Sequence, residues 1–333
     1  MLDYKIKIGL VPNIRDLFDF ATRKGIFEPA KGVENKDKAI NYIKDNFSDD
    51  TVEFTDLEWL NEYGVLYKNS DCFLVSSYLK EQNVDAIFIL NCNFGNEEAC
   101  GRVAKALNIP VLLWGPQDMV FEENGQRYTD CQCGLFAISK QLRRYHIPFS
   151  YIENCPVESK IFADGLEKFL SVVTMVKNFK KLNIVQVGTR LSPFKSVMYN
   201  ELELTEKFGF NLNTVNMAVF IDKFNRILND STVDLKKDMD DVKEKYDLGG
   251  VDDECLKKMV AFIYTYIEIF KETGADVLSS ECWTSMPLGV GANPCLAMSI
   301  LYDMGYIVTC ESDIQNSLGT NSLGTGHFLL QNT

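Results

Sequence analysis

The sequence predicts an α/β protein built as two successive doubly wound domains with mostly parallel sheets. Short apolar runs alternate with longer amphipathic segments, as expected of strands covered by helices. The chain has 333 residues, and domains usually contain roughly 100–200 residues. The polar stretch Lys177–Lys181 interrupts the pattern, so we expect an N-terminal domain at residues 1–180 and a second domain at residues 181–333.

The first domain contains a series of short apolar runs separated by segments with apolar residues at helical spacing. The expected strands are Lys5–Val11, Ala86–Asn91, Val111–Trp114 and Phe149–Ile152. The expected helices are Lys36–Asn46, Asp71–Glu81, Glu97–Leu107, Cys133–Tyr145 and a closing helix at Glu158–Phe179.

A second series begins with NIVQVG at residues 183–188, a strand that ends at a glycine. The other expected strands are Asn211–Asn216, Asp276–Ser280 and Tyr306–Cys310. The expected helices are Ser196–Phe208, Asp234–Tyr246, Asp252–Thr273, Pro294–Met304 and one after Cys310. Between Asn316 and Gly326 the segment NSLGT occurs twice. The repeat is too short for a solenoid, and we expect it to be either a loop or a result of the event that ended the chain.

Composition and charge exclude several classes of protein. The formal net charge is −13, from 47 acidic and 34 basic residues, and an acidic surface repels nucleic acid. No run of about 18 apolar residues suggests a membrane span. The first residues, MLDYKIKIGLVPNIRD, fit a strand better than a signal peptide. The ten scattered cysteines then fit reduced thiols, and we expect a cytoplasmic protein.

Several familiar motifs are incomplete. Gly289–Pro294 (GVGANP) lacks the third glycine of a dinucleotide fingerprint, and no phosphate loop is present, so no nucleotide cofactor is expected. The two histidines, His146 and His327, have no suitable nucleophile beside them. Cys131-Gln-Cys133 lacks the two-residue gap of a zinc pair.

Polar residues follow the expected strands, where ligands bind in open α/β sheets. These strand ends are Pro12–Arg15, Asn91–Phe94, Gly115–Asp118, Gly188–Arg190, Glu281–Trp283 and Glu311–Asp313. A carboxylate between a strand end and a helix start can hold a divalent cation or move a proton. Asp313 equally suits the role of a helix cap. Capping does not require a glutamate, so for Glu311 we favour a functional role.

Four stretches together resemble a known family. They are Ile8–Pro12 with Arg15; Leu113–Asp118 continued by Cys131–Lys140; Val187–Arg190 with Pro193–Glu201; and Cys282–Trp283 with Cys310–Ile314. The sequence resembles the L-fucose isomerase-like branch of the L-fucose/L-arabinose isomerase superfamily, from the first strand to about residue 315.

The resemblance implies a sugar isomerase that converts aldoses to ketoses through an ene-diol, with Mn²⁺ or a similar divalent cation and a small-molecule sugar as partner. It implies that Glu311 is an acidic metal ligand and the proton acceptor. Glu281 and Trp283 would line the sugar pocket, with Asp313 as a further substrate-binding candidate. Arg15, Asn93 and Phe94 match positions that approach a neighbouring subunit's site, so a homo-oligomer, a trimer or a hexamer, is implied.

The sequence also departs from this family. Its second acidic ligand, its metal-binding histidine and its C-terminal β-rich domain would lie beyond residue 333, and Gln315–Ser317 replaces a His-Gly-Ala-like helix start. We therefore expect a truncated form with weak metal binding and little or no isomerase activity. The alternative is a non-catalytic cytoplasmic sugar-binding or regulatory protein. An NAD-dependent dehydrogenase is disfavoured by the incomplete glycine motif.

Overall fold

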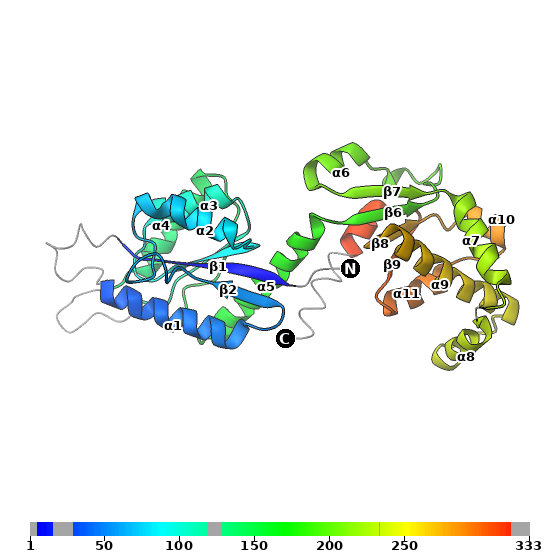
Figure 1. The fold of residues 1–333 in the computed structure, drawn as a ribbon, viewed down its shortest axis with the longest axis horizontal. Helices are drawn as coiled ribbons and strands as arrows, with labels where there is room; N and C mark the ends of the chain where they lie inside the picture. Colours follow the sequence, from blue (N-terminus) through cyan, green and yellow to red (C-terminus); the bar gives the residue numbers. More distant parts are fainter. Residues whose placement is uncertain (1–4, 16–28, 119–127, 233, 321–333) are drawn as a thin grey trace. The chain divides into compact units, whose positions relative to one another are not determined.

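The computed structural model describes residues 5–15, 29–118, 128–232 and 234–320. The chain divides into two compact units. The first unit comprises residues 4–174, and the second comprises residues 175–333. Each unit has its own parallel sheet (Figure 1), which confirms the predicted fold class. The division falls inside helix α5 (Lys160–Phe179), whereas the sequence placed it after that helix.

The sheet of the first unit has the strand order β2-β1-β3-β4-β5. All of its pairs are parallel. Its central strand, β3, pairs with β1 so that Asn13 lies beside Asn91, and the ends of these two strands therefore meet. The strands are β1 (Ile6–Asn13), β2 (Val52–Thr55), β3 (Ala86–Asn91), β4 (Val111–Trp114) and β5 (Ser150–Tyr151).

Alternate residues of these strands face two separate apolar cores, because successive side chains of a strand point to opposite faces. One face, which includes Phe88 and Trp114, packs against α1 (Pro29–Phe47) and α5. The other face, which includes Ile87 and Leu113, packs against the remaining helices. Those helices are α2 (Cys72–Glu81), α3 (Glu97–Leu107) and α4 (Cys131–Arg144). Figure 1 shows the two helical layers.

The sheet of the second unit has the order β7-β6-β8-β9, again with parallel pairs only. Its strands are β6 (Asn183–Val187), β7 (Asn211–Val215), β8 (Val277–Ser280) and β9 (Ile307–Cys310). The register places Ser280 beside Cys310. The residues that follow β8 and β9 consequently leave the sheet at the same edge.

Helix α9 (Asp253–Thr273) forms the centre of the larger core of this unit, where Phe262 and Tyr266 are fully buried. The Asp252 side chain caps its start and Gly274 ends it in the left-handed conformation, as is typical of helix termini. The other helices of this unit are α6 (Glu201–Phe208), α7 (Met217–Asn229), α8 (Leu235–Lys245), α10 (Ser285–Val290) and α11 (Cys295–Asp303).

Several elements differ from the sequence-based expectations. Strand β2 and helices α7 and α10 were not expected. The predicted helix Ser196–Phe208 was too long: Lys195–Val197 forms one 3₁₀ turn, and α6 begins at Glu201 because the Asn200 side chain caps the Glu203 N–H. The helix expected after Cys310 is present at residues 314–320. The remainder of the repeated NSLGT segment and His327 lie outside the described residues.

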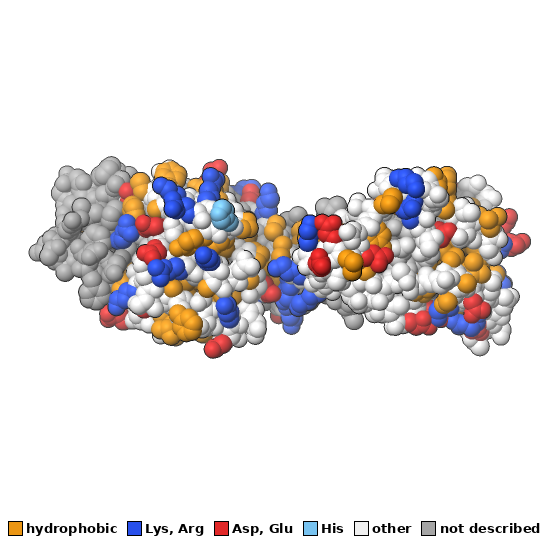
Figure 2. Space-filling model, turned by 90° about the horizontal axis from the view of Figure 1, so that it is seen from above, with side chains coloured by type: hydrophobic (Ala, Val, Ile, Leu, Met, Phe, Trp, Pro, Cys, Tyr) orange, Lys and Arg blue, Asp and Glu red, His pale blue; other side chains and the backbone are white. Residues whose placement is uncertain are grey.

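None of the described helices combines the length and the apolar run that crossing a bilayer requires. On the face drawn in Figure 2, acidic and basic side chains are interspersed over both units. Many of them form exposed ion pairs, such as Lys160–Asp164 and Lys207–Glu203, which contribute little to stability.

Candidate functional site

The candidate site lies at the carboxyl edge of the second sheet. Gly188 follows β6, Glu281 follows β8 and Glu311 follows β9. These three strands are neighbours and parallel, so their ends share one edge. Ligands of open α/β sheets bind beyond such ends.

Glu281 is a fixed carboxylate, with 5% of the residue exposed. Its Oε2 accepts a hydrogen bond from the Thr189 N–H at 2.9 Å, and its Oε1 accepts one from the Ser285 hydroxyl. The space it fills exists because residue 188 is a glycine: a Cβ there would lie 2.6 Å from Glu281 Oε2. Glu281 therefore anchors the loops after β6 and β8.

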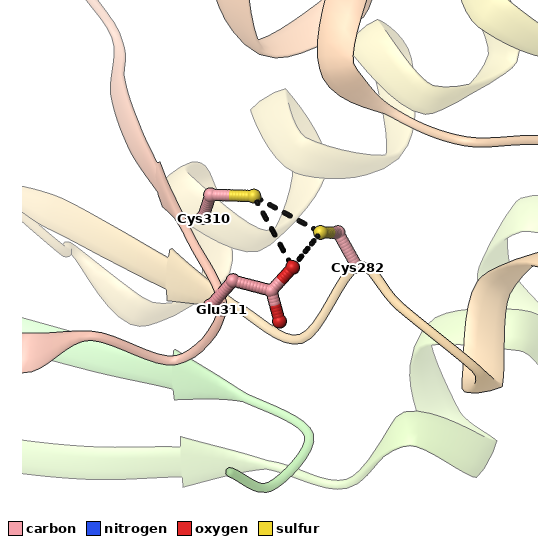
Figure 3. A group of neighbouring side chains, drawn as sticks. All are labelled: Cys282, Cys310 and Glu311. Atoms are coloured by element: carbon pink, nitrogen blue, oxygen red, sulfur yellow. Dashed lines mark hydrogen bonds between the residues drawn. The ribbon is translucent and has the colours of Figure 1, made fainter. Parts of the chain in front are cut away.

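Glu311 is half-buried and lies between two thiols (Figure 3). Its Oε1 accepts from Cys282 Sγ at 2.9 Å and lies 3.8 Å from Cys310 Sγ. The two sulfurs are 3.0 Å apart. Oε2 of Glu311 is buried and has no hydrogen-bond partner in the described part of the chain. An unpaired buried carboxylate oxygen costs free energy, which points to a functional use.

The backbone at this edge is strained. Thr284, Glu311 and Ser312 have φ angles of 66°, 64° and 54°, in the left-handed region that costs roughly 1–2 kcal/mol for residues other than glycine. A β-branched residue such as Thr284 is a genuine outlier there. Residues held in such conformations cluster at functional sites.

The thiols affect one another's ionisation. The close contact between the two sulfurs and burial raise the pKa of Cys282, whereas the contact with Cys282 lowers the pKa of Cys310. Among the interactions that shift either thiol, the charged partners are the other thiol and Glu311.

Trp283, a predicted pocket residue, is 59% exposed. Its ring packs against Phe194 with centroids 5.9 Å apart. The guanidinium of Arg190 donates to three carbonyl oxygens of its own loop, those of Leu191, Ser192 and Phe194. Arg190 therefore holds the loop that carries Phe194.

Asp313 caps the helix at residues 314–320, because its Oδ1 accepts from the Asn316 N–H at 2.9 Å. The capping role considered for this residue is thus observed. Its predicted contact with substrate stays a prediction.

The remaining predicted site residues lie together at the strand ends of the first unit. Arg15 pairs with Glu97 at 3.2 Å and lies over the Phe94 ring at 4.5 Å. Its backbone N–H donates to Asn93 Oδ1 at 2.9 Å. Fully buried Asn13 donates to the Leu90 carbonyl and accepts from the Asn96 N–H. That these residues serve a neighbouring subunit's site stays a prediction.

A cavity of about 490 Å³ adjoins the end of β4. Trp114 and Asp118 line it together with Asn35, Lys38 and Gln117. The Asp118 carboxylate accepts the Cys131 and Gln132 N–H groups at the start of α4, so it caps that helix. The indole N–H of Trp114 has no partner among the described residues.

Cys282 and Cys310 had no predicted function, although both occur in the stretches that resemble the family. The usable signal was their position, since each lies at or directly after the end of an apolar strand run. Two thiols and a carboxylate at neighbouring strand ends converge only once the parallel register is known.

The fold and this edge define a class: a doubly wound α/β protein with carboxylates and thiols at its strand ends. Residues 20–180 match the family described as "Fucose/sulfoquinovose isomerase, N-terminal domain". The chain is similar to the sulfoquinovose isomerases of Priestia aryabhattai (24% identity over 72% of this chain and 52% of the relative) and Alkalicoccus urumqiensis (24%, 70% and 52%). These matches confirm the predicted resemblance to the fucose isomerase-like family.

This chain spans about half the length of those relatives. Among solved structures, a periplasmic solute-binding protein from Actinobacillus succinogenes 130z with bound D-allose aligns over 97% of this chain and 92% of its own. The identity is 12% and the TM-score is 0.22, too low to support an argument.

Proposed function

We propose that this chain is part of an aldose–ketose sugar isomerase in which Glu311 moves a proton between adjacent carbons of the substrate. The observation that carries the proposal is the buried, unpartnered Oε2 of Glu311 at the carboxyl edge of the second sheet. The family match and the sulfoquinovose isomerase relatives support the reaction class.

The chemistry requires a base that takes the proton beside a carbonyl group and returns it to the neighbouring carbon. A carboxylate oxygen within hydrogen-bond reach can do this. Oε1 of Glu311 is held by Cys282, which orients the carboxylate, and Oε2 has no hydrogen-bond partner among the described residues. Glu281 has both oxygens engaged, so it positions the loops and is a poorer base. The exposed Trp283 ring offers an apolar surface for the C–H face of a sugar.

The Mn²⁺-like cation implied by the resemblance does not fit the described residues by themselves. A hard cation usually takes about six oxygen ligands, whereas one carboxylate oxygen without a partner and two sulfurs meet here. No step is therefore derived through it. For the same reason we propose that the 333-residue chain alone has weak activity.

Replacing Glu311 by glutamine tests the proposal. In Glu311→Gln the shape is kept and the base is lost, so we expect aldose–ketose conversion to fall at least ~10²-fold. Glu206→Gln, an exposed carboxylate on α6, is the matched control and should leave the rate unchanged. The assay follows ketose formation from L-fucose, L-arabinose and sulfoquinovose, with and without Mn²⁺.

A wild-type rate in Glu311→Gln would refute the role of Glu311. Tight sugar binding without metal and without turnover would instead favour a sugar-binding or regulatory protein. Calorimetric titration with the same sugars separates these results.

A further inference from the structure

The side chains of Cys282, Cys310 and Glu311 offer two sulfurs and one oxygen that all lie within 4.8 Å of one another. They come from the ends of the adjacent strands β8 and β9. From this convergence we propose that the three residues form a site for a thiophilic divalent cation of the zinc class, with one coordination position left open.

The donor chemistry selects the cation. Thiolates are soft ligands that prefer Zn²⁺ or Cd²⁺, whereas Mn²⁺ and Mg²⁺ prefer carboxylate, carbonyl and water oxygens. Three protein ligands with an open fourth position are typical of zinc sites that bind a water or a substrate. The isolated pair Cys131-Gln-Cys133 offers no comparable set, because no third donor joins it within the described residues.

The distances suit a small adjustment. A tetrahedral zinc ion with bonds of about 2.3 Å holds two sulfurs roughly 3.8 Å apart. The sulfurs are now 3.0 Å apart, and the Glu311 Oε1 distances are 2.9 and 3.8 Å. Zinc binding therefore requires the two sulfurs to move apart, and Cys310 is only partly buried.

The electrostatic setting also calls for a cation. Glu311 forms no ion pair with any residue in the described part of the chain, and its Oε2 has no partner there. The strained φ angles of Glu311 and Ser312 hold this carboxylate against the sulfurs. A cation bound here would compensate the charge of this carboxylate.

This inference does not rest on the proposed isomerase activity, because binding is measured without sugar. The reduced, metal-free 333-residue chain is titrated with Zn²⁺ against a chromophoric chelator. It is also titrated with Cd²⁺, whose bonds to thiolates give an ultraviolet charge-transfer absorption. We expect one equivalent to bind. Cys282→Ser and Cys310→Ser should each weaken binding at least about 100-fold, because loss of even an outer-shell partner costs roughly 10- to 100-fold.

Glu311→Gln should weaken zinc binding while the cadmium–thiolate absorption remains. Cys255→Ser is the control, since Cys255 is an exposed thiol of the same unit, and it should bind as the wild type does. Folding of every variant is checked by circular dichroism. Mn²⁺ is tested in parallel and should show no dependence on the two thiols.

The inference is overturned if Cys282→Ser and Cys310→Ser bind Zn²⁺ as tightly as the wild type, or if the reduced chain binds none. It is also overturned if the thiols are joined in a disulfide that reductant does not open. If zinc binding fails while Glu311→Gln still abolishes isomerisation, this site is wrong and the proposed function stands. If zinc binds and Glu311→Gln isomerises normally, the reverse holds.

Discussion

The strand ends of the two sheets differ in chemistry although the sheets share one architecture. In the first unit, the side chains buried there are mainly amides, those of Asn13, Asn91 and Asn93, with one thiol, Cys92, beside them. In the second unit they are carboxylates and thiols: Glu281, Cys282 and the partly buried Cys310 and Glu311. Amides can satisfy backbone groups without changing charge, whereas carboxylates and thiols can take up protons or cations. The same topological position thus carries mainly amides in one unit and ionisable groups in the other.

The largest effect that this comparison predicts is at Gly95. The residue has a φ of 77°, and a Cβ there would overlap the side-chain oxygens of Asn13 and Asn91. Gly95→Ala should therefore destabilise the first unit by about 3 kcal/mol, from overpacking and left-handed strain together. Urea unfolding followed by circular dichroism measures the free energy of unfolding.

The control for Gly95→Ala is Gly305→Ala. Gly305 also has a positive φ, of 86°, but a Cβ at this position would have no atom within 4 Å. It should lose about 1 kcal/mol, the cost of the strain alone. Equal losses at the two positions would show that the buried amides do not fix the first edge.

At the carboxyl edge of the second sheet, we expect a substitution to raise the free energy of unfolding. Ser312 is fully buried, has a φ of 54° and has an unpartnered hydroxyl among the described residues. Ser312→Gly relieves the strain and removes the unpaired group, so we expect a gain of about 1 kcal/mol in the free energy of unfolding. Ser312→Ala removes the hydroxyl but keeps the backbone strain, and should gain less. A loss of stability in Ser312→Gly would mean that this edge, too, is built for stability.

The smallest predicted effect is on the pH dependence of the stability of the first unit. The buried strand-end amides of the first unit do not titrate, so its acid sensitivity has to come from carboxylates such as Asp56. Burial acts to raise the pKa of Asp56, but the hydrogen bonds from Lys44 and the Glu58 N–H prevail and lower it. A lowered pKa stabilises the fold above the unfolded value of about 3.9 and loses that contribution as pH falls through the folded value.

Asp56→Asn should consequently cost less than about 1 kcal/mol at neutral pH, and the difference from wild type should shrink below pH ~4. Thermal melts across this range measure it. Asp50→Asn, at an exposed position, should leave the pH profile unchanged. A difference for Asp56→Asn that persists at low pH would contradict the assignment.

Most of the fold was predictable because periodicity is a local property. The runs at Ala86–Asn91 and Val111–Trp114 are apolar apart from Asn91, as central parallel strands are, and they form β3 and β4 with the expected bounds. Strand β2 was missed because VEFT is short and half polar. Helix α7 was missed although Phe220, Phe224 and Ile227 recur at helical spacing, so that signal was present in the sequence.

The candidate site was predictable only in part. Glu281 and Glu311 could be selected because they directly follow strands, and chain order alone supplies that information. The contact of Cys282 with Cys310 and Glu311 depends on the register of β8 against β9, which no local pattern contains. The capping role of Asp313 was one of two roles that the sequence allowed.

The glycine at position 188 makes two distant parts of the sequence dependent on each other. Since Glu281 Oε2 occupies the volume that a side chain at 188 would need, any larger residue there would expel the carboxylate and release the Thr189 N–H that it binds. A search for functional relatives can therefore use the pair as a filter: a homologous sequence with a bulky residue at 188 and a glutamate at 281 could not retain this geometry.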